Sequence, residues 1–273
     1  MNNVFNLKRF GKYYSYDFNN AVGNFGVSAL VIGLLPLILL VFFVIFSLLF
    51  TGQVVELPLP VKIMTFGIVV LVVILSAPVK LYGRVTERKA GTDWLMIPAS
   101  SFEKFLSMAI MLCIVLPVVV FGLFVACDLL LGALMPSVYG ESMVSLLKDN
   151  IDVISEMADD ASFAVTTTGG SIVSVWAGWC ASILAFGLGA ICFKKGKAAK
   201  TILCIFALEI LLSLILVIVF KGLDLEQVLP GLFDNMTAGK AEFWTNFLIN
   251  AFYFVVIGGL LAAIFFRVKT IKH

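Results

Sequence analysis

Charged residues are scarce in this chain. Only 13% of its 273 residues are Asp, Glu, Lys or Arg, whereas 61% are hydrophobic. Because roughly a quarter of the residues in soluble globular proteins are charged, this composition excludes a soluble protein and predicts a polytopic membrane protein. The net charge of +2 gives no reason to expect nucleic-acid binding.

Histidine is nearly absent, since His273 is the single histidine and the last residue. This excludes catalysis by a histidine base within the membrane, zinc sites of the HExxH type and rhomboid-like Ser/His pairs. The five cysteines lie in or at the ends of apolar runs without a CxxC spacing, so they indicate neither a disulfide framework nor a metal site. We therefore expect a chain that is not an enzyme and binds no metal.

A phosphate-binding loop of the GxxxxGK[ST] type is also missing. The pair Gly196-Lys197 is followed by alanine, as is the pair Gly239-Lys240, and neither has the upstream glycine. The chain therefore cannot bind and hydrolyse ATP through a Walker site of its own.

Apolar runs of membrane-spanning length dominate what is present. A transmembrane helix needs about 20 predominantly apolar residues, and hydropathy gives six candidates, at about 27–50, 61–81, 105–131, 171–193, 201–220 and 244–266. They predict an all-α fold with six transmembrane helices in a single domain over residues 1–273. With the N-terminus in the cytoplasm, only four of the 19 lysines and arginines fall outside, namely Lys62, Lys148, Lys221 and Lys240. The positive-inside rule thus predicts that both termini are cytoplasmic.

Residues 1–26 precede the first run and have an amphipathic pattern. Apolar side chains such as Leu7, Phe10 and Tyr14 recur at spacings of three and four, with basic residues between them. This pattern predicts a helix that lies in the inner membrane interface. The alternative is a frayed, partly ordered tail, which Gly11 and the following asparagines would favour.

Residues 82–104 form a charged segment between the second and third runs, longer than a plain connector requires. Thr92 or Asp93 would cap a short helix, and Pro98 would end it because proline disfavours helical geometry in the residue before it. The short helix would carry an apolar patch of four consecutive residues, Trp94, Leu95, Met96 and Ile97. This patch predicts a contact surface on the cytoplasmic side.

A second helix start follows at once. Ser100 and Glu103 have the spacing of a capping box, in which each side chain bonds to the backbone N–H of the other residue. We therefore expect the third span to begin near Ser101. The alternative for the whole segment is a solvated loop with a lipid-facing Trp94.

The third span is too long for a simple crossing. From Glu103 to Met135 it would measure about 50 Å as one helix, against a hydrocarbon core of about 30 Å, so it must tilt, kink at Pro117 or protrude. This places Asp128 at the outer boundary, solvated or interfacial. Residues 136–170 then form an external segment, for which apolar and acidic periodicity predicts one amphipathic helix.

Glu209 lies about eight residues into the fifth run. A carboxylate near the centre of a transmembrane helix costs roughly 2.5 kcal/mol or more, so Glu209 is a candidate for a substrate path or a proton relay. The alternative is a structural carboxyl that bonds to Ser213 or to a neighbouring helix.

Small residues mark one face of the fourth run. Such residues let membrane helices approach closely, and here they recur at every fourth position, at Ala177, Ala181, Ala185 and Gly189. They predict a helix-packing face, either within the subunit or across a dimer.

In its arrangement the chain resembles the ABC-2-type permeases, the six-span membrane subunits of bacterial ABC exporters. The connector between spans 2 and 3 of that family typically combines a charged turn, a glycine, a small helix, a Pro-small-Ser sequence and an acid followed by lysine. The matching residues are Glu87-Arg88, Gly91-Thr92, Trp94 to Ile97, Pro98-Ala99-Ser100 and Glu103-Lys104. The chain departs from the family in showing nothing diagnostic between spans 5 and 6.

The resemblance implies that residues 82–104 hold a coupling helix that docks into a groove on a separate cytoplasmic ATPase. Asp93 and Pro98 would frame this helix and Trp94 to Ile97 would contact the ATPase, with Trp94 as the main anchor because buried aromatic residues carry much of the energy of an interface. The ATPase would bind the ATP, so the chain itself needs no cofactor. A second permease subunit would complete the assembly in the bacterial inner membrane.

The leading hypothesis is therefore a permease subunit of an ABC-2-type exporter that moves an apolar or amphipathic substrate. One alternative is a non-transporting membrane scaffold or sensor that reuses the same fold. Another is a proton-coupled secondary carrier, in which Glu209 would be essential. An ATPase encoded next to this chain would favour the first hypothesis.

Overall fold

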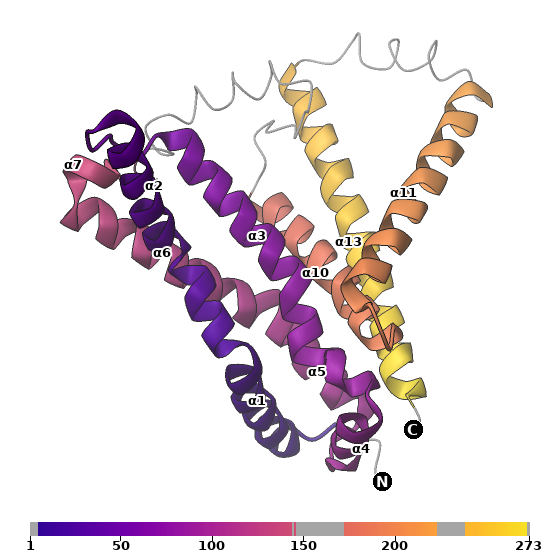
Figure 1. Cartoon of the computed structure of the whole chain (residues 1–273). Coiled ribbons are helices and arrows are strands. Elements are labelled where there is room, and N and C mark those ends of the chain that lie inside the picture. Colours follow the sequence, from indigo (N-terminus) through magenta and orange to yellow (C-terminus); the bar gives the residue numbers. More distant parts are fainter. Residues whose placement is uncertain (1–4, 144, 146–171, 223–237, 272–273) are drawn as a thin grey trace.

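The computed structural model describes residues 5–143, 145, 172–222 and 238–271, and every regular element in these ranges is a helix (Figure 1). The elements are α1 (Leu7–Gly33), α2 (Leu35–Thr51), α3 (Leu59–Tyr82), the 3-10 helix η1 (Gly83–Thr86), α4 (Arg88–Met96), α5 (Ser101–Ile110), the π-helical η2 (Met111–Val115), α6 (Leu116–Leu134), α7 (Pro136–Tyr139), α10 (Ile172–Cys192), α11 (Lys197–Gly222) and α13 (Ala238–Thr270).

Five helical segments are long and apolar enough to cross a membrane, and the bent pair α1 and α2 makes a sixth when it is counted as one span. These segments correspond to the six apolar runs of the sequence, so the chain has the architecture of an all-α multi-pass membrane protein. Of the external segment at 136–170, the structure describes α7 and the residues as far as Met143, together with Ser145. The amphipathic helix expected there lies mostly outside the described residues.

The first helix does not end where the amphipathic pattern ends. We expected a boundary near residue 26, but α1 runs without interruption to Gly33 and α2 departs at an angle of 42°. The break falls at Leu34, immediately before α2. Pro36 lies in the first turn of α2, a position that suits proline because the N–H groups there have no partner within the helix. Asn6 caps the start of α1 through its side chain, which accepts hydrogen bonds from the N–H groups of Lys8 and Arg9. The frayed-tail alternative is therefore wrong for the part of this segment from Leu7 onward.

The long third span contains a π-helical turn. The N–H of Leu116 bonds to the carbonyl of Met111, five residues earlier, and Pro117 follows directly. Proline has no N–H and its ring crowds the carbonyl four residues before it, so a wider turn at this place relieves the crowding. The helical path from Ser101 to Leu134 thereby passes the proline without a gap.

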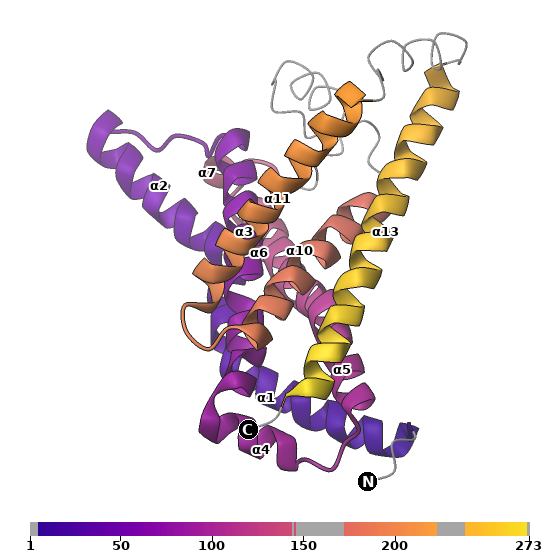
Figure 2. The ribbon, with the colours of Figure 1, turned by 90° about the vertical axis from the view of Figure 1, so that its right-hand side faces the viewer.

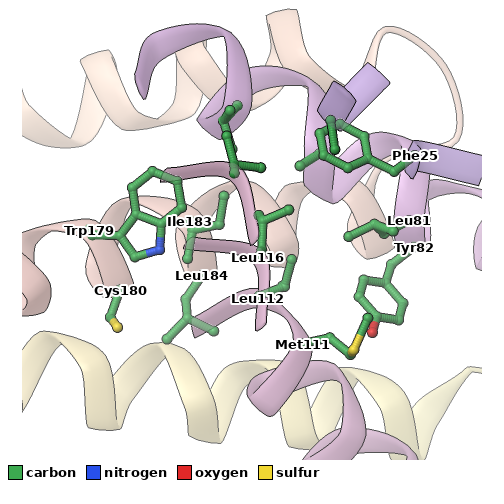
Figure 3. Close-up of a cluster of buried hydrophobic side chains, with 14 of the residues drawn as sticks. Phe25, Leu81, Tyr82, Met111, Leu112, Leu116, Trp179, Cys180, Ile183 and Leu184 are labelled. Atoms are coloured by element: carbon green, nitrogen blue, oxygen red, sulfur yellow. The ribbon is translucent and has the colours of Figure 1, made fainter. Parts of the chain in front are cut away.

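The apolar core lies where α10 meets α3, η2 and α13. Figure 3 shows Leu112 and Leu116 between Ile183 and Leu184 of α10 on one side and Leu81 of α3 on the other. Leu112, Ile183 and Leu184 have no exposed surface. Because lipid tails are as apolar as leucine, close packing rather than exclusion from water holds such helices together.

The small residues of α10 take part in this packing. Ala177 is fully buried, Gly178 faces the ring of Tyr253 on α13, and a Cβ atom placed on Gly189 would overlap the side chain of Thr201 on α11. Ala181 and Ala185, at the positions between, are half-buried. At both glycines the neighbouring helix belongs to the same chain.

Asp128 is not solvated as we expected. Only 1% of its surface is exposed, and its carboxylate accepts hydrogen bonds of 2.5 Å from the Tyr139 hydroxyl and 2.8 Å from the N–H of Met143. Lys62 lies beside Tyr139. Its ammonium is 4.3 Å from the centre of the Tyr139 ring and donates to the carbonyl of Glu141. The expectation failed because α7 folds back over the end of α6 and covers the carboxylate.

A substitution at Gly189 tests the packing of α10. Gly189→Ala should lower the melting temperature of the detergent-solubilised protein, because overpacking a tight contact costs about 1–3 kcal/mol. Gly258→Ala is the matched control, since nothing lies within 4 Å of a Cβ atom at this position on α13 and alanine is favoured over glycine in a helix by about 1 kcal/mol. Equal melting temperatures for the two variants would contradict the packing described here.

Candidate functional site

The connector between α3 and α5 consists of η1 and α4. It lies at one end of the molecule, together with the start of α1 and the last turn of α13 (Figures 1 and 2). Gly83, Val85 and Thr86 of η1 are buried, whereas several residues of α4 are exposed. The connector is therefore buried at its first turn and exposed along part of its second.

Helix α4 begins earlier than the sequence indicated. Glu87 has extended backbone angles and its carbonyl accepts the N–H of Gly91, so the helix starts at Arg88. The expected cap at Thr92 or Asp93 is wrong, because both residues lie inside the helix. No side chain caps its start, and the neighbouring elements therefore have to hold this short helix in place.

The end of α4 and the start of α5 follow the predicted pattern. Ile97 is extended before Pro98, as proline requires. The Ser100 hydroxyl accepts the N–H of Glu103 at 3.2 Å, and the Glu103 carboxylate accepts the N–H of Ser100 at 2.8 Å. The capping box is thus confirmed, and it fixes the angle at which the chain turns from the connector into the third span.

Glu103 also binds the start of α1. Its carboxylate has no exposed surface and accepts two hydrogen bonds of 2.8 Å from the guanidinium of Arg9, one from Nε and one from Nη2. The backbone N–H of Asn6 donates a further bond of 3.0 Å. Charge-assisted bidentate pairs of this kind are the stronger class of hydrogen bond in proteins. No local pattern indicates this pair, because Arg9 lies 94 residues before Glu103.

Trp94 faces the protein rather than the surroundings. Its indole N–H donates to the hydroxyl of Tyr13 on α1 at 3.2 Å. The ammonium of Lys104 on α5 lies 4.4 Å from the centre of the indole ring and donates to the Trp94 carbonyl at 2.7 Å. The alternative of a solvated loop with a lipid-facing Trp94 is therefore wrong.

The other residues of the patch differ in exposure. Met96 is 81% exposed, and Asp93 and Pro98 are exposed beside it. Leu95 and Ile97 are half-buried. Asp93, Met96 and Pro98 form what we call the connector tip, the exposed surface at the end of α4.

A buried acidic residue lies beneath the connector. Asp17 of α1 is 6% exposed, and one of its carboxylate oxygens accepts hydrogen bonds from the hydroxyls of Tyr82 at 2.9 Å and Ser107 at 2.6 Å. Tyr82 ends α3 and Ser107 belongs to α5, so this cluster joins three spans one helical turn from Tyr13. The sequence held one signal that we did not use: Asp17 is the only acidic residue among the first 26.

The turn between α10 and α11 holds the connector from the opposite side. The ammonium of Lys197 donates to the carbonyl of Gly83, and the hydroxyl of Thr86 lies 3.4 Å from the carbonyl of Phe193. Lys197 also lies 3.8 Å from the exposed carboxylate of Glu87. The first turn of the connector is thus linked to the second half of the chain.

Glu209 lies apart from this site. It is exposed on α11, and the Ser213 hydroxyl donates to the carbonyl of Ile210 at 2.8 Å. Lys197, at the start of the same helix, contacts the connector, and Glu209 lies about 18 Å further along that helix. The structure therefore does not bring Glu209 together with the connector.

No protein-family model, curated protein or solved structure matches this chain. The function therefore has to be inferred from the geometry of the chain itself.

A substitution at Glu103 tests the link between α1 and the connector. Glu103→Gln keeps the size of the side chain but removes the charge that binds Arg9, so the first turn of α1 should open and trypsin should cleave after Lys8 and Arg9 roughly tenfold faster. The matched control is Glu87→Gln, which changes an exposed carboxylate of the same connector. If the three proteins are cleaved at the same rate, Glu103 does not hold α1.

Proposed function

We propose that this chain is the permease subunit of an ABC-2-type exporter and that α4 is the coupling helix on which a separate cytoplasmic ATPase acts. The observation that carries the proposal is the way α4 is held. It is a helix of nine residues that contacts α1 through Trp94 and α5 through Lys104, and η1 joins it to α3. A flexible loop would absorb a push from a partner, whereas a helix bonded to α1 and α5 and joined through η1 to α3 would pass the push on.

The connector tip is the docking surface in this proposal. Met96 is an apolar side chain that extends away from the protein. Side chains that insert into a pocket of a partner have this arrangement. Trp94, which we expected to be the main anchor, contacts Tyr13 and Lys104 instead. Its role in the proposal is to transmit movement from the tip to α1 and α5.

The distribution of basic residues supports a cytoplasmic position for this end of the molecule. Lys8 and Lys12 are exposed on α1, Arg84 is exposed on η1, and Lys194 is exposed in the turn that contacts the connector. Figure 2 shows the first part of α1 running across the lower ends of the other helices. A basic helix in this orientation suits the inner membrane interface, and positive charge favours the cytoplasmic side.

The proposal includes two further components. The ATPase would bind the ATP, and a second permease subunit would sit beside the first in the bacterial inner membrane. Between Ile202 and Ile218, almost all the side chains of α11 that the structure describes are exposed, including Glu209. An exposed carboxylate on an apolar helix suits a polar neighbour or a substrate path better than lipid. The apolar spans suit an apolar or amphipathic substrate.

The experiment purifies the full-length chain from its own membranes in mild detergent and measures ATP hydrolysis that co-purifies with it. Mass spectrometry then identifies proteins with a Walker motif. Met96→Asp should remove nearly all of this hydrolysis, because a charge would have to enter an apolar pocket. Met135→Asp is the matched control, since Met135 is a half-exposed methionine at the opposite end of the third span.

Full hydrolysis with Met96→Asp would show that the connector tip is not the docking surface. If the wild-type chain captures no ATPase, the exporter proposal fails and the scaffold or the proton-coupled carrier takes its place.

A further inference from the structure

The described residues line an apolar cavity, open on one side, between the first and third spans. Its volume is about 100 Å³. The walls come from α1, the end of α3, η2 and α6, and each of the lining residues is apolar. The lining includes Phe18, Val22 and Gly26 of α1, Met111 of η2, and Val119 and Val120 of α6.

The cavity has a buried floor and an exposed rim. Met111 and Val120 at the floor are 3% and 0% exposed, whereas Phe18, Val22 and Val119 at the rim are 39%, 53% and 42% exposed. The rim lies on α6 of the third span and on the part of α1 that we place at the inner membrane interface. An exposed apolar rim on such helices opens toward hydrocarbon, so a ligand would enter from the bilayer.

The open space of the cavity depends on Gly26, although the backbone at this position does not require a glycine. A Cβ atom at Gly26 would make one ordinary contact, 3.4 Å from a methyl group of Val22, so alanine would fit there. Glycine inside a helix costs about 1 kcal/mol relative to alanine. A larger side chain would point into the cavity, because Gly26 is one of its lining residues. Gly26 therefore keeps the cavity open at a cost in helix stability.

We propose that this cavity binds one acyl chain of a membrane lipid. Water does not suit the site, because a buried water needs two to four polar partners and the walls are apolar. A helix does not fit, since with its side chains it is about 10 Å wide. A cavity of about 150 Å³ holds a benzene ring, so this smaller space suits the thinner chain of methylene groups.

The bound chain would lie beside the polar cluster of Asp17. Phe18 follows Asp17 in α1, and Leu81, another lining residue, precedes Tyr82 in α3. The acyl chain would therefore support α1 where this helix is bonded to α3 and α5. The site does not require the ATPase, so it can be tested separately from the exporter proposal.

The experiment reconstitutes the full-length chain in phosphatidylglycerol vesicles that contain the same lipid with a diazirine in one acyl chain. After irradiation, mass spectrometry maps the labelled residues. In the wild-type protein the label should concentrate on the lining residues of α1, η2 and α6. Gly26→Leu should reduce this labelling roughly threefold or more, because leucine fills the space.

Gly23→Leu is the matched control. Gly23 lies three residues before Gly26 in the same helix, is exposed, and has nothing within 4 Å of a Cβ atom, so this variant should be labelled as the wild type is. If Gly26→Leu does not fold, Val119→Trp at the rim provides the same comparison.

Three results would overturn the proposal. The first is unchanged labelling of the lining residues in the cavity-filling variant. The second is labelling spread evenly over all exposed apolar helices, which would indicate ordinary surface lipid. The third is labelling of the lining residues that is absent at a high ratio of protein to lipid and appears only on dilution in the vesicles, which would assign the cavity to a second copy of the chain.

Discussion

The charge of Glu103 has to be compensated inside the protein, because the side chain has no exposed surface. Arg9 supplies the opposite charge, and the N–H groups of Asn6 and Ser100 supply further hydrogen bonds. A buried carboxylate that lost one of these partners would become strongly destabilising. The start of α1, the end of the connector and the start of α5 are therefore held together by one side chain, and the other contacts of the connector depend on this arrangement.

Two further contacts extend this constraint into the spans. Trp94 joins α4 to Tyr13, and Asp17, one turn further along α1, joins Tyr82 and Ser107. Movement of α4 relative to α1 would strain the contact between Trp94 and Tyr13, and movement of α1 relative to α3 or α5 would strain the Asp17 cluster. The first, second and third spans thus meet directly above the connector, and the proposal that the connector is a coupling element rests on this arrangement.

Much of the fold could be predicted from local sequence patterns. The six apolar runs and the capping box at Ser100 and Glu103 depend on neighbouring residues, so hydropathy and spacing are enough to find them. The partners of the connector could not be found in this way. Tyr82 lies 65 residues from Asp17, and Trp94 lies 81 residues from Tyr13, so only the packing of the spans brings them together.

The errors have the same origin. Hydropathy indicates how deep Asp128 lies in the membrane, but not that α7 folds back and covers it. Thr92 and Asp93 are good capping residues by propensity, yet the extended backbone of Glu87 lets α4 start earlier. In both cases a contact or a backbone angle outside the local pattern decided the outcome.

The central claim is that α4 is a preformed helix fixed to α1 and α5. Hydrogen–deuterium exchange of the detergent-solubilised chain tests it directly, without any partner. The amide of Gly91, which is bonded to the carbonyl of Glu87, and the amides as far as Met96 should exchange as slowly as those of α5 from Lys104 onward, which are also bonded within their helix. Exchange at the rate of an unfolded peptide would contradict the claim.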